Sequence, residues 1–215
     1  MFNTIFPKIH KEGYKFLAIS ILITFLILFF SKFLGMILIL ITIWVYYFFR
    51  DPERYSINDD KYLVSPADGL ITDISEKTGP EELRLENTSF TRISVFMNVF
   101  NCHVNRIPSS GKVEEIFYKP GKFLNASLDK ASEENERNYF KVKLTNGEEI
   151  IIVQIAGLIA RRIVCEVEQG QDLKQGDRIG MIRFGSRVDI YFKNKKVLAK
   201  LGQNVVAGES LLASE

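Results

Sequence analysis

Two apolar runs near the N-terminus constrain the fold of this 215-residue chain more than any other feature. Residues 16–30 and 33–49 are apolar apart from single serine or threonine residues, and Ser31 and Lys32 separate them. Each run is slightly shorter than the ~20 residues that span a ~30 Å hydrocarbon core, and one helix through both would be far too long. We therefore expect residues 1–49 to form a membrane-associating helical hairpin that bends near Ser31 and Lys32, either as two short spans or as a re-entrant wedge.

Basic residues flank both ends of this apolar region, whereas its centre carries only Lys32. The positive-inside rule then places both ends of the hairpin in the cytoplasm. Two buried core helices would have a similar composition and remain an alternative. A cleaved signal peptide is disfavoured by the length of the apolar region and by its flanks. The flanking charges are Lys8, Lys11, Lys15, Arg50 and Arg54.

The composition changes sharply after the apolar region, where Pro52 ends any nearby helix. Residues 50–61 are interpreted as a polar linker at the membrane surface, and residues 62–215 as one domain large enough for a core of its own. The net charge of +2 gives no reason to expect a nucleic-acid partner. The two histidines lie far from each other, and so do the two cysteines, which predicts neither a metal site nor a disulfide scaffold.

The pattern of apolar residues in this domain is typical of β-structure. Apolar and polar residues alternate at 93–99, 140–144 and 188–192, as they do in half-buried strands. Asn146-Gly147 between two such runs predicts a β-hairpin. Residues 125–138 have no apolar periodicity, so we expect a loop or a short surface helix there.

A glycine-punctuated repeat refines the fold class. Glycines and apolar residues recur with a spacing of three in two segments, and the pattern resembles the half-motifs of biotinyl and lipoyl carrier domains, which are flattened β-barrels. Coincidence in a glycine-rich β-protein is the alternative. We expect a mainly β, flattened-barrel or barrel-sandwich-like domain. The two copies are Gly170, Leu173, Gly176, Ile179 and Gly202, Val205, Gly208, Leu211.

Several short motifs, taken in order, resemble one enzyme family. They are the exit from the apolar region at 50–54, Ser-Pro-Ala-Asp-Gly at 65–69, the Asn/His segment 98–106 and Arg-Phe-Gly-Ser-Arg-Val-Asp at 183–189. Together with the N-terminal hairpin, they resemble the short, single-membrane-anchor branch of the phosphatidylserine decarboxylases. The resemblance covers nearly the whole chain. It implies conversion of phosphatidylserine to phosphatidylethanolamine and CO2, at the cytoplasmic face of a bacterial-type inner membrane.

The resemblance also implies how the cofactor would arise. Removing CO2 from an amino acid needs an electron sink, and no glycine-rich cradle for pyridoxal phosphate is visible here. A serine can supply a ketone instead: Oγ attacks the preceding carbonyl, the amide becomes an ester, β-elimination breaks the chain, and hydrolysis leaves a pyruvoyl group that forms a Schiff base with the substrate amine. Glycine before the serine leaves the carbonyl accessible and tolerates the strained backbone.

By this resemblance, Gly185 and Ser186 match the processing pair, and Ser186 becomes the pyruvoyl cofactor. Fragments 1–185 and 186–215 would remain associated, and a homo-oligomer is possible. Asp68 and His103 match the acid and the histidine near the pyruvoyl group. The departure is Arg106, because the larger-enzyme branch carries a second histidine there. The Asp-His-Ser relay of that branch therefore cannot be carried over.

Two other classes of protein remain as alternatives. A lipoyl- or biotinyl-like carrier would need an exposed lysine at a hairpin tip, where Lys193, Lys195 and Lys196 lie without the expected neighbours. A membrane-anchored adaptor with a β-barrel would carry long heptad helices, and the sequence shows none.

Overall fold

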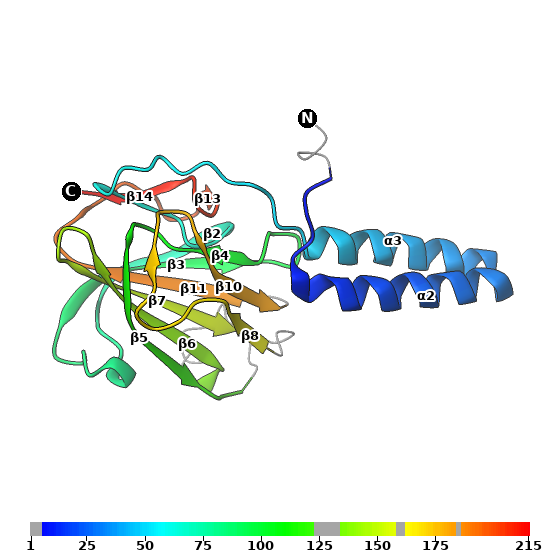
Figure 1. Cartoon of the computed structure of the whole chain (residues 1–215), viewed down its shortest axis with the longest axis horizontal. Helices are drawn as coiled ribbons and strands as arrows, with labels where there is room; N and C mark the ends of the chain where they lie inside the picture. The colour runs from blue at the N-terminus through cyan, green and yellow to red at the C-terminus, as the bar shows by residue number, and fades with distance from the viewer. Residues whose placement is uncertain (1–5, 123–133, 158–161, 184–185) are drawn as a thin grey trace. The chain divides into compact units, whose positions relative to one another are not determined.

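The computed structural model describes residues 6–122, 134–157, 162–183 and 186–215 (Figure 1). The chain divides into two compact units, residues 1–53 and 54–215, here called the helical unit and the β unit. The helical unit holds two apolar helices, and the β unit holds all the named strands. The prediction of a mainly β domain preceded by an apolar helical hairpin is confirmed.

The helical unit turns where the sequence predicted. A short 3-10 helix, η1 (Lys11–Gly13), leads into α2 (Tyr14–Phe30), and α3 (Lys32–Phe48) follows after a single residue. Ser31 has an extended backbone (φ −149°), and its hydroxyl caps α3 by accepting a hydrogen bond from the Leu34 N–H at 3.4 Å. One polar residue between two apolar runs therefore ends one helix and starts the next.

Small polar side chains join the two helices. The Thr42 hydroxyl lies 2.7 Å from that of Ser20 and 2.9 Å from that of Thr24. Gly35 allows close approach, because a Cβ there would collide with Leu28. Close packing of small residues and interhelical hydrogen bonds are how helices associate in lipid, where apolar burial provides no driving force. The stretch Lys11–Phe30 is long and apolar enough to cross a membrane, as judged by length and composition; α3 is shorter.

The β unit is built from antiparallel strands in three sheets. The largest, which curls into a half-barrel, has the order β13-β2-β3-β11-β7-β6-β5-β9; the smaller ones are β4-β10-β8 and β1-β14-β12 (Figure 1). The strands are β1 (Tyr62–Val64), β2 (Gly69–Thr78), β3 (Ser89–Met97), β4 (Val104–Arg106), β5 (Gly111–Lys119), β6 (Arg137–Leu144), β7 (Glu149–Ala156), β8 (Arg162–Cys165), β9 (Asp172–Leu173), β10 (Arg178–Arg183), β11 (Ser186–Phe192), β12 (Lys196–Val197), β13 (Asn204–Val205) and β14 (Leu211–Ser214).

The alternation of side chains gives the large sheet two different faces. Its inner face supplies the main apolar core, which includes Ile93, Val95, Val188 and Ile190 at 0% exposure. Its outer face carries a smaller apolar cluster around Tyr139 and a group of charged side chains. A residue of β11 therefore belongs either to the barrel interior or to this outer face.

The glycine repeat corresponds to two equivalent corners of the β unit. Gly170, Gly176, Gly202 and Gly208 have φ between 76° and 89°, a conformation that disfavours side chains. Equivalent hydrogen bonds follow: the N–H groups of Gly176 and Gly208 donate to Ile107 O and Ser65 O, and those of Gly170 and Gly202 donate to Val113 O and Ile71 O. The predicted pair of related corners is confirmed.

The prediction for residues 125–138 was partly wrong. Arg137 and Asn138 begin β6 instead of lying in a loop, and Asn135 forms a bridge to Lys122. Residues 123–133 lie outside the described part of the chain. Apolar periodicity failed as a signal because the buried side chains here are amides: Asn135 is 0% exposed and Asn138 is 2% exposed.

Candidate active site

Ser186 is the first residue of β11, the orange strand in the middle of the large sheet (Figure 1). It pairs with Met97 of β3 on one side and with Ala156 of β7 on the other. Its side chain is completely buried on the inner face, and Oγ has no hydrogen-bond partner among the described residues. A buried hydroxyl without a partner is costly and calls for a functional explanation. Gly185, the predicted partner in cleavage, lies outside the described residues.

His103 is brought to the same end of β3 as Ser186. β3 ends at Met97, and a turn follows in which Asn98 N–H donates to Asn101 Oδ1 at 2.9 Å. His103 is 0% exposed, and its Nδ1 lies 3.0 Å from the Asn101 carbonyl oxygen. Because a carbonyl oxygen can only accept, Nδ1 carries the proton in this contact, and Nε2 is the nitrogen that can gain or lose one.

Asp68 is a buried carboxylate with two partners. Arg54 Nη2 lies 2.8 and 3.1 Å from its two oxygens, and Ala207 N–H donates to Oδ1 at 2.8 Å. In the other copy of the repeat, Ser110 Oγ accepts from Gln175 N–H at 3.2 Å in the same way. The Asp68 carboxylate therefore closes a corner of the β unit.

Asp68 also lies next in sequence to a residue that packs against the end of β3. The next residue, Gly69, begins β2, and a Cβ there would collide with the Phe96 carbonyl oxygen. β2 thus lies directly against the part of β3 that pairs with Ser186. Asp68, the residue before β2, ties the start of this strand to Arg54 and to Ala207.

Arg106 stands where the larger-enzyme branch has a second histidine. It is 5% exposed, and its Nη1 donates to the Gly176 carbonyl oxygen at 2.7 Å. Gly176 is one of the turn glycines with positive φ, so the guanidinium supports a corner of the fold. An arginine in this contact cannot act as a base, because it stays protonated.

Two groups of residues near the site were missed by the sequence analysis. Arg54 was interpreted as a flanking charge of the hairpin, whereas its side chain is only 16% exposed and binds Asp68. A row of buried amides, Asn105, Gln154 and Asn138, crosses the inner face beside Ser186. The signal for this row was the single glutamine that interrupts the apolar run 150–156.

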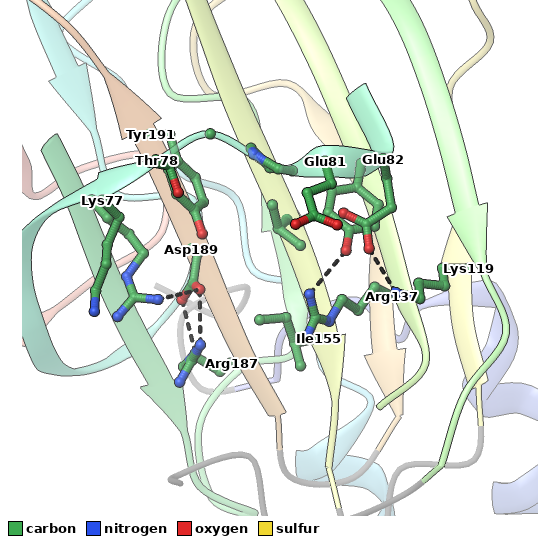
Figure 2. A pocket seen from close by; sticks show the side chains of 15 residues that line it. Lys77, Thr78, Glu81, Glu82, Lys119, Arg137, Ile155, Arg187, Asp189 and Tyr191 are labelled. Carbon is green, nitrogen blue, oxygen red and sulfur yellow. Dashed lines mark hydrogen bonds and ion pairs between the residues drawn. The ribbon is translucent and has the colours of Figure 1, made fainter. Parts of the chain in front are cut away.

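A pocket of about 540 Å³ lies on the opposite, outer face of the same strands (Figure 2). On one side Arg187 Nη2 donates to Asp189 Oδ2 at 2.9 Å; on the other, Lys119 Nζ donates to Glu82 Oε1 at 2.7 Å. Since Ser186 and Arg187 are consecutive in a strand, their side chains lie on opposite faces of the sheet. The pocket therefore does not receive the Ser186 side chain.

Tyr191, Tyr139 and Glu82, which line this pocket, have pKa values shifted away from neutrality. Burial raises the pKa of Tyr191 to about 12, and Asp189 adds to the rise. Burial also raises the pKa of Tyr139. For Glu82, burial opposes ionisation, but hydrogen bonds, first among them that from Lys119, hold its pKa below the usual value. His103 is the one histidine in the β unit, so it is the one imidazole available there for proton transfer.

The structure also bears on the carrier-type lysine and on metal binding. Lys195 has a side chain with 0% exposure, and its Nζ lies 3.0 Å from Glu148 Oε2, which is unsuited to a lysine that must carry a swinging prosthetic group. Among the described residues, no group of three or more His, Cys, Asp and Glu side chains is placed to hold a metal ion.

We expect Asp68→Asn to lower stability without preventing cleavage of the chain. The amide keeps an acceptor for Ala207 N–H but leaves the largely buried Arg54 without its counter-charge, at a cost of about 1–3 kcal/mol. Thermal unfolding in detergent measures the loss, with Ser110→Ala as the matched change in the other corner. A stable Asp68→Asn protein that remains one uncleaved chain would instead show that the carboxylate takes part in cleavage.

Known proteins match this chain over nearly its whole length. The family described as phosphatidylserine decarboxylase matches residues 41–213. A phosphatidylserine decarboxylase proenzyme of Pelagibacter ubique (strain HTCC1062) is 66% identical over 215 residues, covering all of both chains. Proteins of the same name from Rickettsia akari (strain Hartford) and Rickettsia typhi (strain Wilmington) are each 49% identical over 213 residues, covering 99% of this chain and 92% of theirs. The chain therefore belongs to the phosphatidylserine decarboxylase family.

Proposed function

We propose that this chain cleaves itself between Gly185 and Ser186 and then decarboxylates phosphatidylserine to phosphatidylethanolamine at the position of Ser186. The observation that carries the proposal is the buried Ser186 hydroxyl, which has no hydrogen-bond partner among the described residues. Membership of the family supplies the substrate and the reaction, and the word proenzyme in the relatives' names implies processing. The pyruvoyl group derived from Ser186 would supply the electron sink for loss of CO2.

The surroundings of Ser186 fit such a group. A pyruvoyl group is small and uncharged, and the neighbours of Ser186 in the sheet, Met97 and Ala156, are apolar and fully buried. A dry, apolar setting excludes water, which would otherwise compete at the carbonyl, and strengthens every nearby hydrogen bond.

The strand pairing supports continued association of the fragments after cleavage. Fragment 186–215 would contain β11, which is hydrogen-bonded to β3 and β7 along its length. The same fragment contributes β13 beside β2 and β14 beside β1. A central strand of this kind cannot leave without exposing the main core, so the two fragments stay together.

We assign His103 the role of proton donor and Asp68 the role of a positioning residue. Loss of CO2 leaves a carbanion that must be protonated, and an imidazole suits this because its pKa is near neutrality. The contact between Nδ1 and Asn101 O leaves Nε2 as the donating atom. Asp68 would act through Arg54 and Ala207, which anchor the start of β2, the strand that pairs with β3.

The helical unit would hold the enzyme at the cytoplasmic face of the membrane that contains its substrate. The substrate's acyl chains stay in the bilayer, so the β unit must work at the interface. Apolar side chains cover α2 and α3, and basic residues precede them. Each basic residue near an anionic surface adds ~1 kcal/mol of attraction.

A protein truncated to residues 54–215 should cleave normally yet act poorly on lipid in vesicles. These residues form the β unit and include the Arg54–Asp68 pair. Removing several basic residues, each worth ~1 kcal/mol, should lower turnover of phosphatidylserine vesicles at least about tenfold. A short-chain soluble analogue should be turned over at nearly the full-length rate. Equal rates on vesicles, after cleavage has been checked by gel, would show that another surface docks to the membrane.

Reductive trapping tests the chemical proposal directly. Incubation with phosphatidylserine and cyanoborohydride should attach lipid to the N-terminus of fragment 186–215. Attachment to a lysine instead, or no attachment to active protein, would overturn the assignment of Ser186.

A further inference from the structure

A row of buried amides runs across the inner face of the large sheet. Asn138 Nδ2 donates to Gln154 Oε1 at 3.3 Å, and Gln154 Nε2 donates to Asn105 Oδ1 at 2.8 Å. Asn105 and Gln154 are 0% exposed, and Asn138 is 2% exposed. Gln154 and Asn138 face each other in β7 and β6, whereas Asn105 reaches across from β4 in another sheet.

The hydrogen bonds give this row a direction. Reversing one amide alone would bring two NH2 groups, or two carbonyl oxygens, against each other, so the three amides share one orientation. In the orientation that the structure shows, the row ends in a donor, the Nδ2 of Asn105. The acceptor that the structure provides for this donor is the Met97 thioether at 3.6 Å, and sulfur accepts only weakly.

The free end of the row lies beside the reaction centre. Met97 is the residue that pairs with Ser186 in the sheet. Ser186 Oγ, buried on the same face, has no hydrogen-bond partner among the described residues. Two poorly satisfied polar groups thus flank one methionine in an otherwise apolar interior. His103, two residues before Asn105 on extended backbone, lies on the same side of its segment.

We propose that Asn105 is a substrate-binding residue whose Nδ2–H donates a hydrogen bond to the carboxylate of the serine headgroup, the group that leaves as CO2. The proposal rests on the proposed function of Ser186. It makes Asn105 the residue that distinguishes the substrate, which has this carboxylate, from the product, which lacks it. The Gln154 and Asn138 amides orient the donor without touching the lipid.

A neutral donor suits a carboxylate that must be lost. An arginine would bind the charged carboxylate strongly but would stabilise the nearly uncharged transition state less, and so would raise the barrier. The neighbouring cation, Arg106, is turned onto Gly176 O by a 2.7 Å hydrogen bond. The inner face therefore presents the carboxylate with an oriented dipole in a dry setting.

The test compares the same substitution at the two ends of the row. Asn105→Asp keeps the acceptor for Gln154 but replaces the donor beside Met97 with an oxygen. Asn138→Asp replaces the donor to Gln154 Oε1 with an oxygen, so it should reverse the row and turn the Asn105 carbonyl oxygen toward Met97. Gln175→Glu, at a buried amide outside the row, is the control for an added carboxylate. Purified, cleaved protein is incubated with cyanoborohydride and either phosphatidylserine or phosphatidylethanolamine, each in neutral mixed micelles. The measurement is the initial rate at which each lipid becomes covalently attached to the small fragment.

We expect Asn105→Asp to lower the ratio of phosphatidylserine to phosphatidylethanolamine attachment by about 10- to 100-fold, the range for a hydrogen bond to a charged group. Asn138→Asp should lower the ratio in the same direction, whereas Gln175→Glu should change the attachment rates of both lipids by the same factor. If Asn105→Asp fails to fold, Asn105→Ala is compared with Gln175→Ala in the same way. An unchanged ratio in the Asn105 variant would overturn the proposal. Absence of trapping in the wild-type protein would instead overturn the function proposed for Ser186.

Discussion

The Ser186→Ala variant should remain a single uncleaved chain and should not decarboxylate phosphatidylserine. Alanine has no Oγ to attack the preceding carbonyl, so neither the ester nor the pyruvoyl group can form. The fold should survive, because the new methyl group occupies a buried site between Met97 and Ala156 and removes a hydroxyl that has no hydrogen-bond partner among the described residues. Gel electrophoresis and a decarboxylation assay measure the two outcomes.

Ser186→Cys is the control that separates loss of the nucleophile from damage to the site. A thiolate can attack the same carbonyl, and β-elimination of the resulting thioester leaves the same small fragment. This variant should therefore cleave and regain activity. Normal cleavage of Ser186→Ala would show that the break lies elsewhere or is made by another protein.

The His103→Ala variant should cleave but should lose about 10²–10⁴-fold in turnover, the range for removal of a general acid or base. Without Nε2, no imidazole remains in the β unit to protonate the carbanion. Because the carbanion would then have to take its proton from a poorer donor, decarboxylation should become the slow step. A decarboxylation assay on cleaved protein, with cleavage checked by gel, measures the loss.

His10→Ala is the matched control for this prediction. It removes the other histidine, which lies in the helical unit and caps η1 through its side chain. Its turnover on a soluble short-chain analogue should stay near that of the wild-type protein. Full activity in cleaved His103→Ala would remove this residue from the reaction.

The features that were predicted correctly from the sequence depend on local patterns. The hairpin bend follows from one polar interruption between apolar runs, since Ser31 caps the second helix whatever lies around it. The two corners follow from glycine spacing, because positive φ at Gly170 and Gly202 excludes most other residues. Family resemblance added the site residues, and the structure places Ser186 and His103 at one end of β3.

The features that were missed depend on contacts between distant segments. The sequence around Arg54 predicts a charge at the membrane surface, whereas its guanidinium forms an ion pair with Asp68 in the β unit. Asn105 and Gln154 are 49 positions apart and come from different sheets. The sequence near either residue therefore gives no sign of the hydrogen bond between them. Buried amides also break the apolar periodicity on which strand prediction depends, which is why the start of β6 was taken for a loop.

Intact-mass analysis of the purified wild-type protein tests the central claim most directly. The account predicts two associated chains, residues 1–185 and a fragment 186–215 that is lighter than the simple hydrolysis product by the mass of one ammonia. That difference reports conversion of the N-terminal serine amine into a ketone. An uncleaved chain with full activity, or an active small fragment with an ordinary serine at its N-terminus, would contradict the assignment of Ser186.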